Sequence, residues 1–172
     1  MQGARSTVAR VVSRSNAAAV REEVSMATAD PIRALKEIVF AFNVADWPRL
    51  RAAISDDVVY EEVGTGRRLQ GGDAYLELCK GWKTAFSNGH GSVDRELANG
   101  DSGALELTWT GTQSGPLEGP AGTLPASGRT FTMRSSFWCR ADGGRAAELS
   151  HHLDMLTMLT DLGALPARTS TG

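Results

Sequence analysis

The spacing of the apolar residues changes near residue 91, and this change limits the folds open to the chain. Before it, apart from a short predicted hairpin at 56–70, apolar side chains recur every three or four positions, as on one face of a helix. After it they alternate with polar ones, as in strands. The sequence therefore predicts an α+β domain with helices packed on one face of a sheet.

Three helices are predicted ahead of the main strands. Asp30 and Pro31 suit the start of the first, and Asp46 suits the start of a shorter second one. The third ends at Asn88. Its broad apolar face comprises Tyr75, Leu78, Cys79, Trp82 and Phe86. Helices with such faces can cover a sheet.

Four consecutive strands follow and predict an antiparallel meander. Asn99-Gly100 joins the first two, and Asp142-Gly143-Gly144 joins the last two. The middle connection, residues 114–128, is unusually long and contains three prolines and four glycines. Long loops beside pockets are often lids. A mobile tip without a role is the alternative, and the sequence does not decide between them.

The length of 172 residues indicates one domain, placed here at residues 30–167. Residues 1–29 are rich in Ala, Ser and Arg and are expected to be a disordered or artefactual extension, although a transit peptide has a similar composition. Residues 168–172 are expected to form a flexible tail. No apolar run approaches the roughly 20 residues of a membrane span, so a cytoplasmic location is predicted.

Charge and metal-ligand spacing exclude two classes of partner. The formal net charge is −2 and no basic stretch with interleaved aromatics occurs, so nucleic acid is not an expected partner. Three histidines and two cysteines match no usual zinc spacing, so no metal is expected. Cys79 and Cys139 are predicted to be buried free thiols.

A curved sheet closed on one side by helices forms a cone with an apolar pocket. The stretches that carry family information are "DWPRLRAAISDDVVYEE", "GTQSGPL", "SGRTFTMRSSFWCR" and "LSHHLDMLTMLTDLG". In these the chain resembles the SnoaL-like polyketide cyclase, or ester cyclase, family of the NTF2-like superfamily, over about residues 31–165. The resemblance implies the cone and a homodimer formed through the outer sheet face.

The resemblance also implies a reaction without cofactor or metal. In the best-understood members of the family, an aspartate in the cavity acts as acid–base group in an intramolecular aldol closure of a polyketide ester. The matching residue here is Asp154. The family commonly has His where this chain has Gln113, and an aromatic where it has His152, so the pocket chemistry is expected to differ.

Asp154 has two readings that the sequence leaves open. In the strand reading of residues 146–154, Asp154 shares a face with Ser150 and His152, while His151 lies on the other face. Asp154 is then the catalytic base, with His152 as its proton partner. Alternatively Asp154 caps the helix that follows, which would lower its pKa, and His152 is a surface residue. His151 is expected on the outer face or at an interface.

Five further residues are predicted to contact substrate. Three are expected as pocket walls or core residues, Trp82, Trp109 and Phe137. Tyr60 is expected near the opening, and Gln113 as an oxygen ligand or a strand-end residue in water. Tyr60 or Glu62 is also a candidate acid near the opening, the alternative being a Glu pair in solvent on an edge strand. Arg134 is expected on the outward face of its strand, in a salt bridge or at a dimer contact.

The leading hypothesis is a cofactor-independent acid–base enzyme, a SnoaL-like cyclase or isomerase, that acts on a small apolar carbonyl compound such as a polyketide. The alternative is a non-catalytic small-ligand-binding or dimerisation module on the same fold. A third and weaker hypothesis is epoxide or ester hydrolysis, which usually needs two acids and an Arg in the pocket. Only Asp154 is well placed for that role in the sequence.

Overall fold

The computed structural model describes residues 30–119 and 122–166. The extension and the tail predicted at the two ends lie outside the described residues. Helix α2 (Pro31–Val44) begins as the sequence predicts, because the Asp30 carboxylate accepts a hydrogen bond from the Arg33 backbone N–H at 2.8 Å.

The next two helices also begin close to the predicted positions. The Asp46 carboxylate accepts from the Arg49 backbone N–H at 3.1 Å and starts the short helix α3 (Trp47–Ala52). Helix α4 (Gly72–Ala85) starts after Gly71, whose φ of 98° favours glycine. The predicted helices before residue 90 are confirmed.

Six strands form one curved sheet in the order β2-β1-β8-β7-β4-β3. Their bounds are β1 (Ile54–Glu62), β2 (Arg67–Gln70), β3 (His90–Asn99), β4 (Ser102–Thr112), β7 (Thr130–Asp142) and β8 (Arg145–Leu153). The order β3-β4-β7-β8 confirms the predicted meander. The sheet is mixed, because β1 pairs with β8 in parallel while the other neighbours are antiparallel.

The prediction of three helices is incomplete. Among the described residues a fourth helix, α5 (Met155–Asp161), follows β8 directly. The apolar run after Asp154 therefore continues as a helix that packs against β7. In the prediction this segment entered only as the alternative in which Asp154 is a cap.

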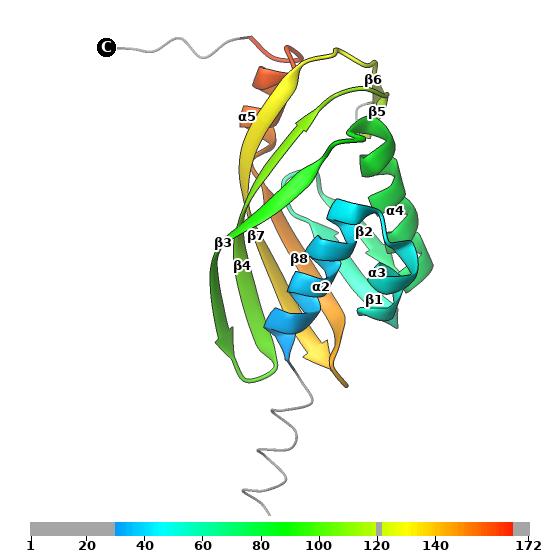
Figure 1. Ribbon diagram of the computed structural model, residues 1–172, viewed down its shortest axis with the longest axis vertical. Helices are drawn as coiled ribbons and strands as arrows, with labels where there is room; N and C mark the ends of the chain where they lie inside the picture. The colour runs from blue at the N-terminus through cyan, green and yellow to red at the C-terminus, as the bar shows by residue number, and fades with distance from the viewer. Residues whose placement is uncertain (1–29, 120–121, 167–172) are drawn as a thin grey trace, which may run out of the picture.

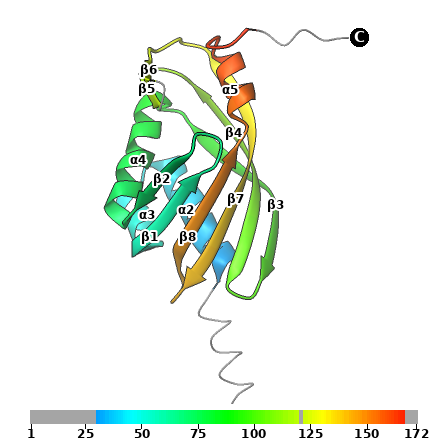
Figure 2. The ribbon, with the colours of Figure 1, turned by 180° about the vertical axis from the view of Figure 1, so that it is seen from behind.

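The helices α2, α3 and α4 cover one face of the sheet, and the other face of β8, β7 and β4 is open when seen from behind (Figures 1 and 2). The long middle connection contains a small second sheet, made of β5 (Leu117–Gly119) and β6 (Gly122–Leu124). This hairpin contacts α4 and lies at the same end of the molecule as α5 (Figure 1).

The core lies between the covering helices and the sheet. One cluster joins α2 and α4 to the sheet, and a second joins the end of α4 to β5, β7 and α5. Trp109 packs against both clusters. Cys79 and Cys139 are free and buried, as predicted.

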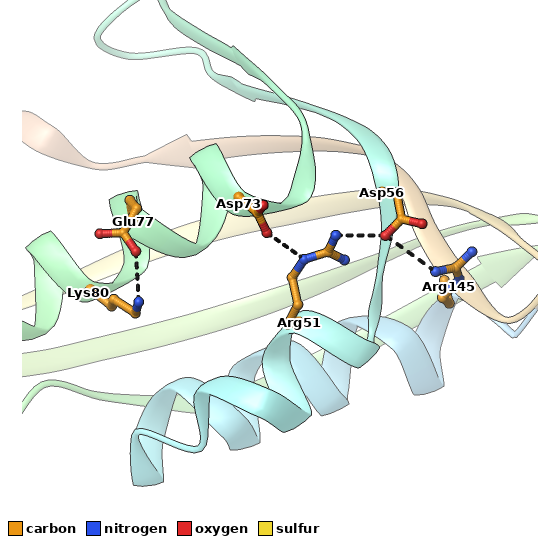
Figure 3. A network of polar contacts seen from close by, with 6 residues as sticks. All are labelled: Arg51, Asp56, Asp73, Glu77, Lys80 and Arg145. Carbon is orange, nitrogen blue, oxygen red and sulfur yellow. Dashed lines mark hydrogen bonds and ion pairs between the residues drawn. The ribbon is translucent and has the colours of Figure 1, made fainter.

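An ion-pair network on the surface connects α3, α4, β1 and β8 at the end of the molecule opposite to α5 (Figure 3). Arg51 of α3 contacts Asp73 of α4 at 2.9 Å and Asp56 of β1 at 2.6 Å. Asp56 in turn lies 4.0 Å from Arg145, at the start of β8. These are exposed or half-buried pairs, so we assign them a part in the packing of α3 and not in a site.

Candidate functional site

An apolar cavity of about 70 Å³ lies inside the cone. Side chains of α2, α4 and four strands line it, and most are aromatic or aliphatic. The larger ones include Phe42, Trp82, Trp109, Phe131, Met133 and Phe137. Such a lining favours uncharged ligands, because a charge would lose its hydration without gaining a partner.

His151 brings an imidazole into this lining from β8. Its side chain stacks on Phe137 with 4.3 Å between the ring centroids, and only 8% of the residue is exposed. Burial, with a smaller contribution from the charge of neighbouring His152, lowers the pKa of His151 to about 3. The ring is therefore neutral at pH 7.

A short hydrogen-bonded chain stands behind the imidazole. The indole Nε1 of Trp109 donates to the Ser135 hydroxyl at 3.0 Å. The same hydroxyl lies 3.1 Å from Nε2 of His151. Ser135 is buried, so this chain fixes the orientation of the imidazole.

A buried carboxylate lies beside the cavity. Glu62 is fully buried, and its oxygens accept from the Thr65 hydroxyl at 2.6 Å and the Tyr60 hydroxyl at 3.3 Å. Nη1 of Arg67 lies 3.5 Å away and supplies the opposite charge. Tyr60 lines the cavity, and its pKa is raised well above its usual value by burial and then by the charge of Glu62.

Glu62 also lines a groove of about 370 Å³ on the outside of the cone. The groove runs between the β1–β2 turn, α4, the β5–β6 hairpin and α5. Trp82 belongs to both the groove and the cavity. Trp82 is therefore a wall common to the cavity, which His151 lines, and the groove, which Glu62 and Arg67 line.

The predicted walls are found around the cavity. Tyr60, Trp82, Trp109 and Phe137 all line it. Whether they bind a substrate stays a prediction. The predicted inward face of β4 is also found, since Leu105 and Leu107 are fully buried.

Gln113 lies outside the cavity lining although it is fully buried. Its amide donates to the backbone oxygens of Leu124 and Pro125, at 3.2 Å each, and accepts from the Ser127 hydroxyl at 2.8 Å. The side chain is thus bonded to the segment that follows β6. It anchors this loop instead of facing a ligand.

Asp154 and His152 are exposed, and neither lines the cavity. One oxygen of Asp154 accepts from the Thr157 backbone N–H at 3.0 Å, and the other accepts from the Thr157 hydroxyl at 2.6 Å. This is the N-cap arrangement of α5. His152 lies 3.3 Å from the Ser150 hydroxyl on the outward face of β8.

The expectation that His151 lies on the outer face is wrong, for a reason visible in β8. The strand alternates as predicted, with His151 opposite in direction to Ser150 and His152. The inward face, however, is the one that carries Leu149 and Leu153, and His151 stands between them. These flanking leucines are the sequence signal for its burial.

The expectation of a solvated Glu pair on an edge strand is half correct. Glu61 is exposed, whereas Glu62 shares the inward face of β1 with Val58 and Tyr60. β1 is not an edge strand, because β2 and β8 flank it. The alternation from Val58 to Glu62 indicates this burial in the sequence.

Residues 30–119 and 122–166 lack two features, a cluster of metal-binding side chains and a helix able to cross a membrane. These residues contain no group of three or more His, Cys, Asp or Glu side chains placed to hold a metal ion. Their helices include none with the length and apolar character needed to cross a bilayer.

The cone, with its helices on one face of a curved mixed sheet, defines an NTF2-like, ketosteroid isomerase-like fold. The sequence model of the SnoaL-like polyketide cyclase family matches residues 32–162. The chain therefore belongs to the SnoaL-like polyketide cyclase family. The sequence matches none of the curated proteins.

Solved structures with the same fold come from several bacteria. AclR, a proposed hydroxylase from Streptomyces galilaeus, is 24% identical with a TM-score of 0.68, over 80% of this chain and 83% of that one. IdmH, a proposed polyketide cyclase from Streptomyces antibioticus, is 27% identical with a TM-score of 0.66, over 78% and 99%. An LEH-like epoxide hydrolase from M. tuberculosis is 22% identical with a TM-score of 0.60, over 77% and 89%.

Proposed function

We propose that this chain is a cofactor-independent acid–base enzyme that acts on a small, largely apolar carbonyl compound and promotes ring closure or isomerisation. One observation carries the proposal: the buried carboxylate of Glu62 is joined, through the Tyr60 hydroxyl, to an apolar cavity that holds the neutral imidazole of His151. Membership of the polyketide cyclase family supports this reaction class.

The proposed reaction begins with loss of a proton from the carbon next to the carbonyl. A ligand whose carbonyl lies at His151 and whose chain passes Tyr60 toward the groove brings that carbon near Glu62. Glu62 takes the proton, and His151 stabilises the oxygen, on which negative charge develops. Thr65 and Arg67 hold the carboxylate in place.

The resulting enolate has two outcomes. In ring closure its carbon attacks a second carbonyl of the same molecule, a carbon–carbon bond forms, and Glu62 returns the proton to the new alkoxide. In isomerisation Glu62 returns the proton to a different carbon. The catalytic roles predicted for Asp154 and His152 stay predictions, and the exposure of both side chains favours Glu62 and His151 instead.

Exchange of hydrogen for deuterium at the carbon beside a carbonyl tests the proposal without the natural substrate. Small ketones and keto esters are incubated in D2O with the protein, and deuterium uptake is followed by NMR. We expect Glu62→Gln to slow the exchange by about 100-fold or more, the usual contribution of a general base. Glu61→Gln is the matched control, since Glu61 is an exposed neighbour of the same chemistry.

Two results would overturn the assignment of Glu62. One is an unchanged exchange rate in folded Glu62→Gln protein. The other is loss of exchange in Asp154→Asn with normal folding, which would return the catalytic role to Asp154.

A non-catalytic ligand-binding module is the second candidate function. It is favoured by the almost wholly apolar lining and by the capping role of Asp154, since neither requires turnover. It predicts that ketones bind in the cavity and exchange no faster than in buffer. Epoxide hydrolysis has less support, because among the described residues that line the cavity or the groove only Glu62 and Glu118 are acids, and Glu118 is exposed.

A further inference from the structure

The hydrogen-bonding chain behind His151 determines which ring nitrogen carries the proton. The indole of Trp109 has a donor and no acceptor, so its bond to Ser135 Oγ occupies a lone pair of that oxygen. Ser135 has one hydroxyl proton to place. Among the described residues, Nε2 of His151 is the acceptor found within reach of that hydroxyl, at 3.1 Å. The arrangement in which this hydroxyl proton has an acceptor is the one in which Ser135 donates to Nε2.

A nitrogen that accepts a hydrogen bond carries no proton of its own. A neutral imidazole has a single N–H, so the proton of His151 resides on Nδ1. Stacking on Phe137 and burial keep the ring in this orientation.

Nδ1 has no hydrogen-bond partner among residues 30–119 and 122–166. The residue is more than nine-tenths buried and lines the cavity. An N–H donor that lacks a protein partner gains a hydrogen bond when a ligand atom accepts from it. The largely apolar lining of the cavity thus includes the imidazole of His151, with an N–H donor that no described residue accepts from.

We propose that His151 binds an uncharged ketone or ester carbonyl through Nδ1–H, and that Ser135 and Trp109 are positioning residues that hold the imidazole in this tautomer. A carboxylate is a poorer ligand, because the lining offers it no cation to offset its lost hydration. The binding statement stands alone, whereas its catalytic consequence, a neutral donor to the enolate oxygen, rests on the proposed function.

The tautomer can be measured directly. Protein labelled with ¹⁵N in the imidazole rings gives long-range ¹H–¹⁵N correlations that distinguish Nδ1–H from Nε2–H, and His151→Gln identifies the signals of His151. We expect a neutral ring protonated on Nδ1 at pH 7. A proton on Nε2, or a charged ring, would overturn the proposal.

Variants of the positioning residues test the chain itself. Trp109→Phe removes the donor to Ser135, and Ser135→Ala removes the donor to Nε2, so both should let the proton of His151 redistribute toward Nε2. Ser136→Ala is the matched control, because Ser136 is the next residue and lies on the other face of β7. The proposal fails if the tautomer in folded Trp109→Phe and Ser135→Ala equals that of the wild type.

Ligand binding supplies the second readout. Cyclopentanone and cyclopentane have similar shapes, and only the ketone accepts a hydrogen bond. After correction for the stronger hydration of the ketone, we expect the wild type and Ser136→Ala to bind cyclopentanone about tenfold more tightly than cyclopentane. This factor is the value of one buried hydrogen bond. Ser135→Ala should lose most of this preference. Equal preference in Ser135→Ala and the wild type would count against the proposal.

The two proposals fail separately. If His151 has the Nδ1–H tautomer and prefers the ketone but no deuterium exchange occurs, the donor site stands and the enzymatic function fails. If exchange depends on Glu62 but His151 is protonated on Nε2, the function stands and the donor site fails.

Discussion

Burial of the His151 imidazole makes the stability of the fold depend on pH in a specific window. The unfolded chain takes up a proton at His151 below about pH 6.5. The folded chain takes it up only near pH 3, because burial lowers the pKa of this residue to about 3. Between these values the unfolded state binds more protons, so the free energy of unfolding falls as the pH falls. About one pH unit above 6.5, where the unfolded imidazole is also neutral, the effect is absent.

Chemical denaturation of the wild type and His151→Gln at pH 7.5, 6.5 and 5.5 measures this effect. From pH 6.5 to 5.5 we expect the wild type to lose about 1 kcal/mol more than the variant. His152→Gln is the control, because His152 is exposed and its removal should leave the loss unchanged. Parallel pH profiles for the wild type and His151→Gln would contradict the neutral burial of this ring.

Asp154 provides a second prediction for a single side chain. Asp154→Ala removes the acceptor for the Thr157 backbone N–H at the start of α5, so the free energy of unfolding should fall by about 1 kcal/mol. Asp154→Asn keeps an acceptor and should lose less. If the side chain is only a cap, both variants retain the deuterium exchange of the wild type. Denaturation and the exchange assay together check this prediction.

In the strands, the sequence predicts that neighbouring side chains alternate between two faces, but it does not predict which face is turned toward the core. The sequence separates His151 from His152 and Glu61 from Glu62, since neighbours in a strand point to opposite faces. Which face is inward depends on the sheet order, in which β8 lies between β1 and β7. That order arises from the parallel pairing of β1 and β8, which are far apart in sequence. No local pattern reports such a pairing.

The long connection after β4 shows a second limit of sequence reasoning. Its length and turn residues predict a loop, either a lid or a mobile tip, and the β5–β6 hairpin forms within it. The bonds that fix it run from the Gln113 amide to backbone oxygens of Leu124 and Pro125. Every residue has a backbone oxygen, so the sequence does not reveal which one will meet a buried amide. For this reason the sequence predicts Gln113 only as an oxygen ligand or a strand-end residue in water, and not as the anchor of the loop.

Replacing this anchor should loosen the loop. Gln113→Leu removes the donor to the backbone oxygens of residues 124 and 125, so we expect a loss of about 1 kcal/mol in the free energy of unfolding and faster amide exchange in residues 122–128. Gln70→Leu is the control, because Gln70 is exposed at the end of β2. Hydrogen exchange detected by mass spectrometry compares the two. Equal protection of the loop in both variants would contradict the anchoring role.

At the scale of the whole molecule, the sheet has one covered face and one open face. The covered face holds the cavity, and the residues in it come from α2, α4 and four strands. The aromatic walls of the cavity could be predicted, because apolar residues that recur with the period of a helix or a strand indicate its buried face. A polar residue on a strand fits solvent and a pocket equally well, so the inward position of Glu62 and His151 is indicated only by the apolar residues that flank each of them on the same face.

The open face carries the predicted homodimer contact, which stays a prediction. Trp138 of β7 points outward and is 48% exposed, on the same side as Arg134 and Arg140. Arg134 pairs with Glu106 and Arg140 with Glu148 across neighbouring strands, so the charges around the indole are already paired. An exposed indole within paired charges suits a contact with a second copy of the chain.

Trp138→Glu would place a charge at the centre of that contact, and the predicted dimer should dissociate. Because Trp138 and Phe137 point to opposite faces of β7, cavity binding should be retained by the resulting monomer. Leu156→Glu is the matched control, since Leu156 is 57% exposed on α5, a helix whose Met158 packs with inward-facing residues of β7, and should leave the dimer intact. Sedimentation velocity at several concentrations gives the masses. A monomeric wild type, or a dimer that survives Trp138→Glu, would mean that the open face of the sheet has another use.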